Sequence, residues 1–319
     1  MKGLWLENQD LAYREDIPKP EPKAGEALVK TRLAGVCATD LEMTHGYYPF
    51  TGVPGHEFVG EVVEAPGYPG WIGTRVVGEI SLTCGKCEAC RAGRTHHCAN
   101  RRVLGILGKD GVLAEYFSLP LANLHAVPDA VTDEAAVFTE PLAAAIQIQQ
   151  QVRIQPGMRV LVVGAGRLGL LIAQTLKLTG CDLAVVVRRE APARLLADWG
   201  IPAVDAKTVR ANSADLGVEV TGSPSGFALS QEAVRPAGTL VLKSTFAGDV
   251  SLNLSALVVD EITLVGSRCG PFNPALRLLA AGLVDTGSMI HGRYGLSDSL
   301  AAFEKAAESG VLKVLVAPD

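Results

Sequence analysis

Four of the seven cysteines lie close together between residues 84 and 98. Their spacing is C-x2-C-x2-C-x7-C, and two-residue gaps let one short loop turn successive sulfurs onto a single cation. Four thiolates close a tetrahedral zinc site and leave no position for a substrate, so we expect a structural metal. Disulfides or free thiols are the alternative, and we interpret the neighbouring His96 and His97 as surface residues. The expected ligands are Cys84, Cys87, Cys90 and Cys98.

A glycine-rich stretch, VLVVGAGRLGLL, predicts a nucleotide site. Gly164, Gly166 and Gly169 have G-x-G-x-x-G spacing directly after an apolar run typical of a buried strand and before a helical pattern. These glycines permit a tight turn, close approach of a pyrophosphate and close helix–strand packing. A glycine-rich turn without cofactor is the alternative. Further candidate cofactor contacts are Arg167, Leu168 and, after a later strand, Thr221.

The next apolar run, LAVVVRRE, bears on which dinucleotide binds. An NAD site usually has an acidic residue about 20 residues past the glycines, which accepts from the ribose 2′-hydroxyl. Here the run ends in Arg188 and Arg189, whose guanidinium groups suit a 2′-phosphate. We therefore favour NADP(H) over NAD(H). The alternative is that the arginines only solvate a strand end and Glu190 contacts the ribose.

Three other stretches carry groups that bind metals: GVCATD with Cys37, VPGHEFVGE with His56 and Glu57, and FTEPLAAAI with Glu140. Each group alone has an ordinary structural explanation, such as a small buried cysteine or a carboxylate that stabilises a helix start. Together they supply a thiolate, an imidazole and one or two carboxylates. That set suffices for a catalytic zinc with one position open to water or substrate.

Composition limits the class of protein that these motifs serve. The 319 residues and 33.5 kDa are enough for two domains, and a net charge of −5 leaves no basic excess for nucleic acid. The start, MKGLWLENQDLAYRED, turns acidic before an apolar segment can form, and Gly, Lys or Arg interrupts the longest apolar runs. We expect no signal peptide, no membrane span and a cytoplasmic protein, where closely spaced cysteines favour metal over disulfides.

The order of the expected elements indicates an α/β protein with two domains. Residues 1–140 are rich in Gly and Pro with short strand-like runs, which predicts a compact β-rich domain. From about residue 142, strands alternate with helices, which predicts a doubly wound parallel sheet. Only about 15 residues separate the second helix of this part from the next strand, so we expect a reduced or missing crossover helix there. The last part reads as two helices and a strand that extends this sheet or returns to the first domain.

The whole chain resembles the zinc-dependent medium-chain dehydrogenase/reductase family, the alcohol and polyol dehydrogenases. GVCATD, VPGHEFVGEVVE, the four-cysteine loop, EPLA and VLVVGAGRLG occur in the order and spacing of that family. The resemblance implies a GroES-like catalytic domain at residues 1–141 and 271–319 and a Rossmann domain at residues 142–270. It also implies a homodimer or homotetramer and a small alcohol or carbonyl compound as substrate.

The resemblance also implies roles for individual residues. Cys37 and His56 would bind the catalytic zinc, and Glu57 or Glu140 would complete the set directly or through water. Thr39 would take the proton of the alcohol, although TDLE, residues 39–42, also reads as a helix capping box. Glu42 stands where the family often continues the relay with His, so either Glu42 carries the proton or water leaves directly. Near the nicotinamide we expect Lys243, Ser244, Ser267 and Cys269; for Lys243 the alternative is a solvated strand end.

These features predict an oxidoreductase that transfers a hydride between NADP(H), or NAD(H), and a secondary alcohol of a polyol, sugar or related hydroxy compound. A glutamate at position 140, where alcohol dehydrogenases commonly have Cys, makes the chain more similar to the polyol, sugar and threonine dehydrogenases. One alternative is a biosynthetic NADPH-dependent reductase of an aldehyde or ketone. The other is a zinc-stabilised nucleotide-binding protein without catalysis.

Overall fold

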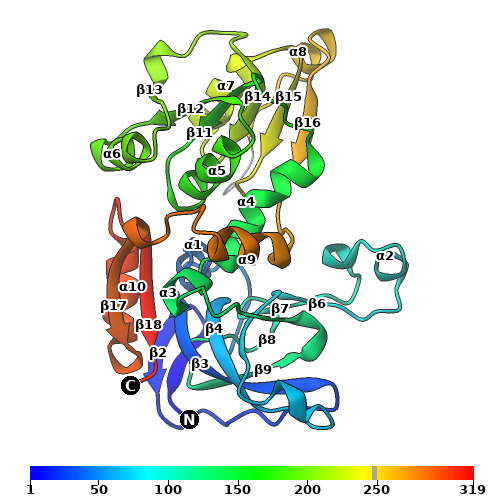
Figure 1. Cartoon of the computed structure of the whole chain (residues 1–319), viewed down its shortest axis with the longest axis vertical. Helices are drawn as coiled ribbons and strands as arrows, with labels where there is room; N and C mark the ends of the chain where they lie inside the picture. The colour runs from blue at the N-terminus through cyan, green and yellow to red at the C-terminus, as the bar shows by residue number, and fades with distance from the viewer. Residues whose placement is uncertain (246–249) are drawn as a thin grey trace. The chain divides into compact units, whose positions relative to one another are not determined.

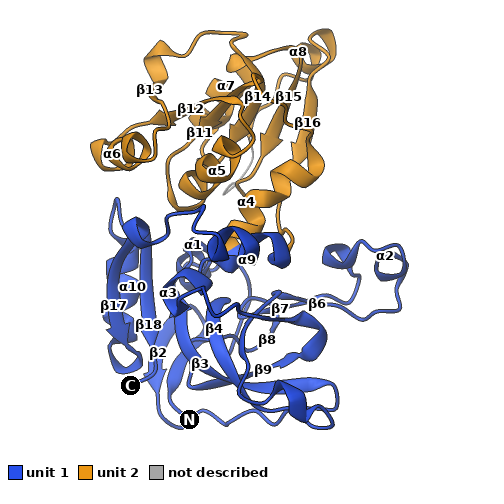
Figure 2. Ribbon diagram, in the orientation of Figure 1, with its two compact units in different colours: residues 1–140, 272–319 blue, residues 141–271 orange. Residues whose placement is uncertain are grey.

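The computed structural model describes residues 1–245 and 250–319. The chain divides into two compact units, which Figure 2 shows in different colours. The first unit contains Met1–Glu140 and Phe272–Asp319, and the second contains Pro141–Pro271. Within the described ranges, no helix is long and apolar enough to cross a membrane.

A seven-stranded, mostly antiparallel sheet is the centre of the first unit. Its strand order is β10-β5-β4-β3-β18-β17, and β9 also pairs with β3. The strands are β3 (Glu26–Gly35), β4 (Glu57–Glu64), β5 (Arg75–Gly78), β9 (Tyr116–Pro120), β10 (Leu124–Ala126), β17 (Ile290–Gly295) and β18 (Lys313–Ala317). Val29 and Leu33 of β3 are fully buried, and Phe58 of β4 packs edge-on against Phe117 of β9, with ring centroids 4.7 Å apart. These apolar residues form the core that holds the strands in place, and the strands in turn position the polar residues at their ends.

Smaller elements complete the first unit. The strands β1 (Gly3–Glu7) and β2 (Asp10–Arg14) form a two-stranded hairpin. A separate three-stranded sheet consists of β6 (Ser81–Leu82), β7 (Arg102–Leu104) and β8 (Gly108–Lys109). The helices are α1 (Ala38–Thr44), α2 (Glu88–Arg91), α3 (Asp133–Ala136), α9 (Phe272–Ala280) and α10 (Ser299–Ala307). The helix α4 (Thr139–Gln151) begins at the end of this unit and continues into the second.

The last strand of the chain returns to the first sheet. In Figure 1, β18, drawn in red, lies beside β3, drawn in blue, and the two pair antiparallel with Leu315 opposite Gly35. Of the two possibilities that the sequence left open, the return to the first domain is therefore the correct one. The strand β17, which pairs in parallel with β18, is an element that the sequence patterns did not reveal.

The second unit is a six-stranded parallel sheet with helices. Its order is β13-β12-β11-β14-β15-β16, which is the doubly wound arrangement with a switch point between β11 and β14. The strands are β11 (Arg159–Val163), β12 (Asp182–Val187), β13 (Ala203–Asp205), β14 (Ala214–Glu219), β15 (Val234–Leu242) and β16 (Thr263–Gly266). The helices are α5 (Arg167–Lys177), α6 (Glu190–Asp198), α7 (Pro224–Ala233) and α8 (Leu254–Val259).

The segment between α6 and β14 has no α-helix, as its short length predicts. It contains only the short strand β13 and a 3-10 turn, Ala206–Thr208. The short strand β13 itself was not predicted. Its three residues extend the sheet at the edge next to β12.

Candidate metal centres and cofactor loop

The four cysteines of the loop between β6 and β7 come together. One sulfur from each of Cys84, Cys87, Cys90 and Cys98 lies within 4.8 Å of the other three. Cys87 is the N-cap of α2, which turns the chain so that Cys90 faces the same point. Cys98 is buried and the other three are half-buried. His97 is exposed, His96 is half-buried, and neither belongs to this group.

Backbone N–H groups of the loop favour anionic sulfur. N–H groups of Lys86 and Cys87 are the main reasons why the pKa of the Cys84 thiol is lowered to about 6. Burial and the neighbouring cysteines raise the pKa of Cys90 to about 11, so the four thiols do not ionise alike. Four sulfurs around one point, some already held as thiolates by amide donors, fit a closed zinc site.

A second group consists of Cys37, His56 and Glu57, whose ligand atoms also lie within 4.8 Å of one another. Cys37 follows β3, and His56 directly precedes Glu57, the first residue of β4. Because β3 and β4 pair antiparallel with Gly35 opposite Glu57, the end of one strand meets the start of the other. The imidazole and the carboxylate are buried and the thiol is half-buried. Three donors of these types fit a zinc ion with an open coordination position.

The start of α1 fixes the orientation of Cys37, and it differs from the predicted start. Cys37 is the N-cap, and the Asp40 carboxylate accepts a 2.8 Å hydrogen bond from its backbone N–H. The capping box is therefore Cys37 with Asp40, and the predicted box of Thr39 with Glu42 is wrong. The reason is that the helix begins at Ala38, so that Asp40 rather than Glu42 occupies the third helical position.

Asp40 also orients His56. The side chain of Asp40 is fully buried, and its Oδ1 lies 3.2 Å from Nδ1 of His56. Burial alone lowers the pKa of His56, but the charges of Asp40 and Cys37 outweigh burial and raise that pKa well above its ordinary value. With Nδ1 directed to the carboxylate, Nε2 remains for a metal, the arrangement common to metal-binding histidines.

Glu57 is held by a buried lysine from the last strand. Nζ of Lys313 donates to Oε2 of Glu57, and both side chains are almost completely buried. A Cβ at position 35 would lie 2.7 Å from the same Oε2, so the glycine there makes room for the carboxylate. Lys313 compensates one negative charge of a donor set that would otherwise carry two.

Thr39, Glu140 and Glu42 were also predicted for this centre. Oγ1 of Thr39 is 3.8 Å from Sγ of Cys37, and Thr39 is half-buried. Glu140 stands in the first turn of α4, half-buried, and is not part of the three-residue group. Glu42 and His45 are exposed on α1 and in the turn that follows it.

The glycine loop joins β11 to α5. Gly164 has a φ of 120°, which other residues rarely adopt, and a Cβ at Gly169 would lie 2.1 Å from the carbonyl oxygen of Gly164. A Cβ at Gly166, the N-cap of α5, would meet no atom within 4 Å. The backbone is therefore open to a ligand at Gly166, while Arg167 and Leu168 begin the helix and are half-buried.

The end of β12 carries the two predicted arginines. Both are exposed; Arg188 donates to Oγ of Ser225 at 3.1 Å, and Arg189 is the N-cap of α6. The Glu190 carboxylate pairs with Arg194 at 2.5 Å. The guanidinium groups are thus available to solvent at the strand end, and the Glu190 carboxylate is engaged with Arg194.

The ends of β14, β15 and β16 carry the remaining predicted cofactor contacts. Lys243 is 8% exposed and donates to Oγ of Ser267 at 3.1 Å and to the Arg268 carbonyl at 2.6 Å, so its interpretation as a solvated strand end is wrong. Ser244 and Cys269 are half-buried. Thr221 is fixed by Glu219, whose Oε1 accepts from both the N–H and the hydroxyl of Thr221 at 2.6 Å.

Three buried charged residues of these sites were not predicted: Asp40, Glu219 and Lys313. Each had a signal in the sequence. Glu219 and Lys313 interrupt the apolar runs GVEV and LKVLV, and Asp40 lies three residues after Cys37. A charge inside an apolar run predicts a buried ion pair or a functional group, because unpaired buried charges are costly.

The fold and the two centres define a zinc-dependent oxidoreductase with a dinucleotide-binding domain. Residues 23–129 match the alcohol dehydrogenase GroES-like domain, and residues 168–281 match the zinc-binding dehydrogenase domain. The chain belongs to the zinc-dependent medium-chain alcohol and polyol dehydrogenase family, and it is an NAD(P)-dependent dehydrogenase.

Named relatives cover nearly the whole chain. An L-threonine 3-dehydrogenase of Pyrococcus abyssi is 32% identical over 92% of both chains. A sorbitol dehydrogenase of Halalkalibacterium halodurans is 30% identical over 95% of both. A zinc-binding dehydrogenase from Sinorhizobium meliloti bound to NADP has a TM-score of 0.92 at 28% identity, covering 99% of both chains. An alcohol dehydrogenase from Escherichia coli CFT073 complexed with NADH has a TM-score of 0.90 at 26% identity, also covering 99% of both.

Proposed function

We propose that the chain oxidises a secondary alcohol of a polyol, sugar or related hydroxy compound with NADP+, at a zinc held by Cys37, His56 and Glu57. The observation that carries this proposal is that these three side chains share one point, within 4.8 Å of one another. Glu140 lies outside that group and is the alternative third ligand or a water-mediated one. Metal analysis of Glu57→Gln and Glu140→Gln variants separates the two assignments, because only loss of the direct ligand should release zinc from the folded enzyme.

The chain's own residues would position the alcohol and remove its proton. A zinc ion bound there would lower the pKa of an alcohol in its open position toward neutrality. The Thr39 hydroxyl, next to Cys37, would accept the proton and pass it to water or toward Glu42 on the exposed side of α1. Asp40 and Lys313 would keep His56 and Glu57 in place without contacting the substrate. A Thr39→Val variant should lose most of kcat and keep its zinc.

For the cofactor we favour NADP(H). The support is the pair of exposed arginines at the end of β12, where an NAD site usually has a carboxylate. An Arg188→Asp variant should lower kcat/KM for NADP+ by about 10–100-fold and raise it for NAD+, because a charge-assisted bidentate contact becomes a repulsion. Arg153→Asp, an exposed arginine before β11, is the matched control. An unchanged preference in Arg188→Asp would contradict the assignment.

The substrate class rests on the relatives that are named threonine and sorbitol dehydrogenases. A screen of polyols, sugars, hydroxy amino acids and simple alcohols with NADP+ and NAD+, with and without chelator, tests it. Turnover that survives complete removal of metal would contradict the zinc mechanism. If NADPH proves the preferred form, reduction of an aldehyde or ketone by the same residues is the second candidate.

We also propose a homodimer or homotetramer in a reducing compartment. Leu254, Val258 and Val259 of α8 are between 65% and 79% exposed, beside the edge strand β16. An apolar surface next to an unpaired strand edge favours association with another copy. All seven cysteines are free thiols, as a four-thiolate zinc site requires. Light scattering of the wild type and of a Val258→Asp variant tests the interface.

A further inference from the structure

The missing crossover helix leaves part of one face of the parallel sheet uncovered. The helices α5 and α6 pack on β11, β12 and β13, and α7 packs on β14, β15 and β11. Among the described residues, the turn Ala206–Thr208 and Val209 after it pack against apolar side chains of β11, β12 and β13, where a crossover helix would otherwise lie. Apolar side chains of the strands that a helix would cover are therefore only partly buried there, Ala184 and Val204 among them.

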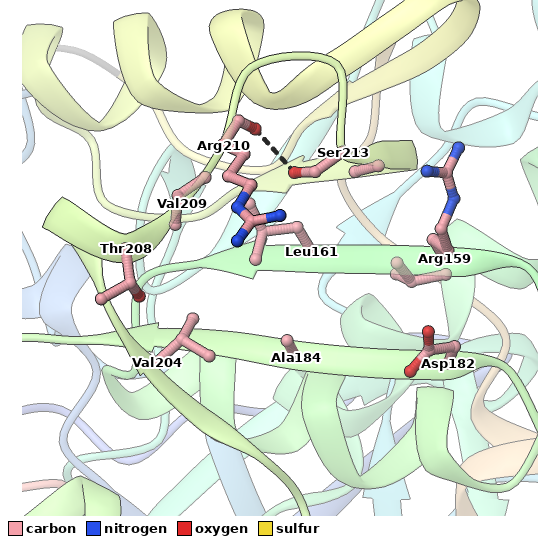
Figure 3. A pocket seen from close by; sticks show the side chains of 11 residues that line it. Arg159, Leu161, Asp182, Ala184, Val204, Thr208, Val209, Arg210 and Ser213 are labelled. Atoms are coloured by element: carbon pink, nitrogen blue, oxygen red, sulfur yellow. Dashed lines mark hydrogen bonds between the residues drawn. The ribbon is translucent and has the colours of Figure 1, made fainter.

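A hollow of about 240 Å³ lies at this place (Figure 3). Its lining is mainly apolar and includes Leu161 of β11, Ala184 of β12, Val204 of β13 and Val209 of the segment before β14. Figure 3 shows these residues between Arg159 with Asp182 at one end and Thr208 with Arg210 toward the other. The hollow thus has an apolar body with charged groups at its ends.

The two arginines of the lining differ in what they can bind. Arg159 is already engaged, because its guanidinium holds Asp215 at 3.0 and 3.2 Å. Arg210 is exposed, and its guanidinium has no hydrogen bond or ion pair to any residue in the described part of the chain. Oγ of Ser213 donates to the Arg210 carbonyl at 2.7 Å, which closes the turn, and in Figure 3 the Arg210 side chain extends from that turn toward Leu161.

We propose that this hollow binds a small aliphatic monocarboxylate, with its chain on the apolar floor and its carboxylate on Arg210. A guanidinium pairs with a carboxylate through two parallel hydrogen bonds. A single free cation matches a single negative charge, and the Asp182 carboxylate in the same lining disfavours a dianion such as a phosphate monoester. The mixed charge of the rim likewise favours a free small molecule over an anionic membrane surface.

The volume sets the size of the ligand. A cavity of about 150 Å³ accommodates benzene, so by proportion this hollow takes roughly ten non-hydrogen atoms. Octanoate has about that size. At a binding energy per atom somewhat above that of drug-sized ligands, as small ligands reach, its dissociation constant falls between roughly 10 µM and 1 mM.

This site is separate from the glycine loop. Its lining includes Arg159, Asp182 and Ala214, which are the first residues of β11, β12 and β14. Gly164 follows the last residue of β11 and lies at the opposite ends of the strands. A bound carboxylate would therefore leave the loop that holds the dinucleotide free.

Calorimetric titration of the zinc-loaded protein with octanoate tests the proposal. We expect saturable binding that weakens about tenfold or more in Arg210→Gln and further in Arg210→Glu. Arg153→Glu, at an exposed arginine outside the hollow, is the matched control and should bind as the wild type does. Octanol and octylammonium should bind at least tenfold more weakly than octanoate, because neither has the carboxylate that forms two charge-assisted hydrogen bonds with a guanidinium. An Ala184→Phe variant should also bind octanoate weakly, because the phenyl ring would occupy the apolar part of the hollow.

Several results would overturn the proposal. Octanoate affinity that is the same in wild type and Arg210→Gln would place the fatty acid elsewhere, for instance at the catalytic centre. Tighter binding of octyl phosphate than of octanoate would contradict the monocarboxylate. The absence of saturable binding up to 10-fold above the expected range would contradict the site itself. If in that case light scattering shows an oligomer that Arg210→Glu dissociates, the hollow belongs to an interface between copies.

Discussion

The two candidate metal centres are built in opposite ways. The four-cysteine group comes from one continuous loop, is mostly half-exposed, and is supported by backbone N–H groups. The group of Cys37, His56 and Glu57 comes from separate elements, is mostly buried, and is supported by charged side chains, Asp40 and Lys313. The first arrangement would enclose a metal with four donors. The second would leave one coordination position open, and its surrounding charged residues orient the donors.

Removal of one expected ligand from each centre should distinguish the two centres most clearly. Cys37→Ala and Cys90→Ala should each reduce zinc from two ions per chain to one, measured by mass spectrometry. We expect Cys37→Ala to lose activity by about 10³-fold or more, since the metal supplies several kcal/mol of charge stabilisation. Cys90→Ala should instead lower the melting temperature and keep activity per folded chain within about tenfold. One zinc in the unmodified protein would remove the distinction between the centres and favour the non-catalytic alternative.

Removing one partner of the buried Glu57–Lys313 pair should cost much more stability than removing one partner of an exposed pair. Replacing Lys313 with Met leaves the Glu57 carboxylate buried without its cation, and should lower the free energy of unfolding of the metal-depleted protein by roughly 3–5 kcal/mol. The double variant with Glu57→Gln should recover most of this loss. Lys305→Met, which breaks an exposed pair with Glu308, is the control and should cost less than about 1 kcal/mol. Urea unfolding of the wild type and the three variants measures these losses; equal losses in the two single variants would contradict the supporting role of Lys313.

Asp40 should raise zinc affinity only at the group of Cys37, His56 and Glu57, and not at the four-cysteine group. Asp40→Asn removes the charge beside Nδ1 of His56, and we expect zinc to bind about 10–100-fold more weakly there. Competition with a fluorescent chelator resolves the two ions, and the affinity of the four-cysteine group should stay unchanged. Asp10→Asn, on the exposed hairpin, serves as the control. A loss at both centres would show general destabilisation instead.

Alkylation of the metal-depleted four-cysteine loop should show the smallest effect. The thiolate is the reactive form, and it increases as pH rises through the pKa. Cys84, with its pKa lowered to about 6, should therefore be modified fastest at pH 7, and its rate should reach a plateau above that pH. Cys90, with its pKa raised to about 11, should be slowest and should accelerate up to high pH. Mass spectrometry of iodoacetamide adducts measures both. Equal rates would show that the amide donors lose their arrangement without zinc.

The same contrast explains what the sequence could predict. The four cysteines and the glycine loop are local motifs whose spacing implies their geometry, and the structure brings the cysteines together. Cys37, His56 and Glu57 were grouped with Glu140 from their metal-binding side chains and predicted as ligands by a resemblance. The proximity of the three depends on the register of β3 with β4. Lys313 was missed because it reaches the site only through the pairing of β18 with β3, which no local pattern encodes. The capping box was misplaced because its outcome depends on where α1 starts, and helix boundaries are weakly specified by sequence.

The pairing of Glu57 with Lys313 has a consequence for biosynthesis. The two residues are 256 positions apart, and the entire dinucleotide-binding unit is synthesised between them. At about 5–20 residues per second, the glutamate waits roughly 13–50 s for its cation. The four-cysteine loop has all its donors as soon as residue 98 has been made. A ribosome-bound chain could therefore bind zinc at the four-cysteine loop early. The group of Cys37, His56 and Glu57 would be complete with Lys313 only after β18 has joined the sheet.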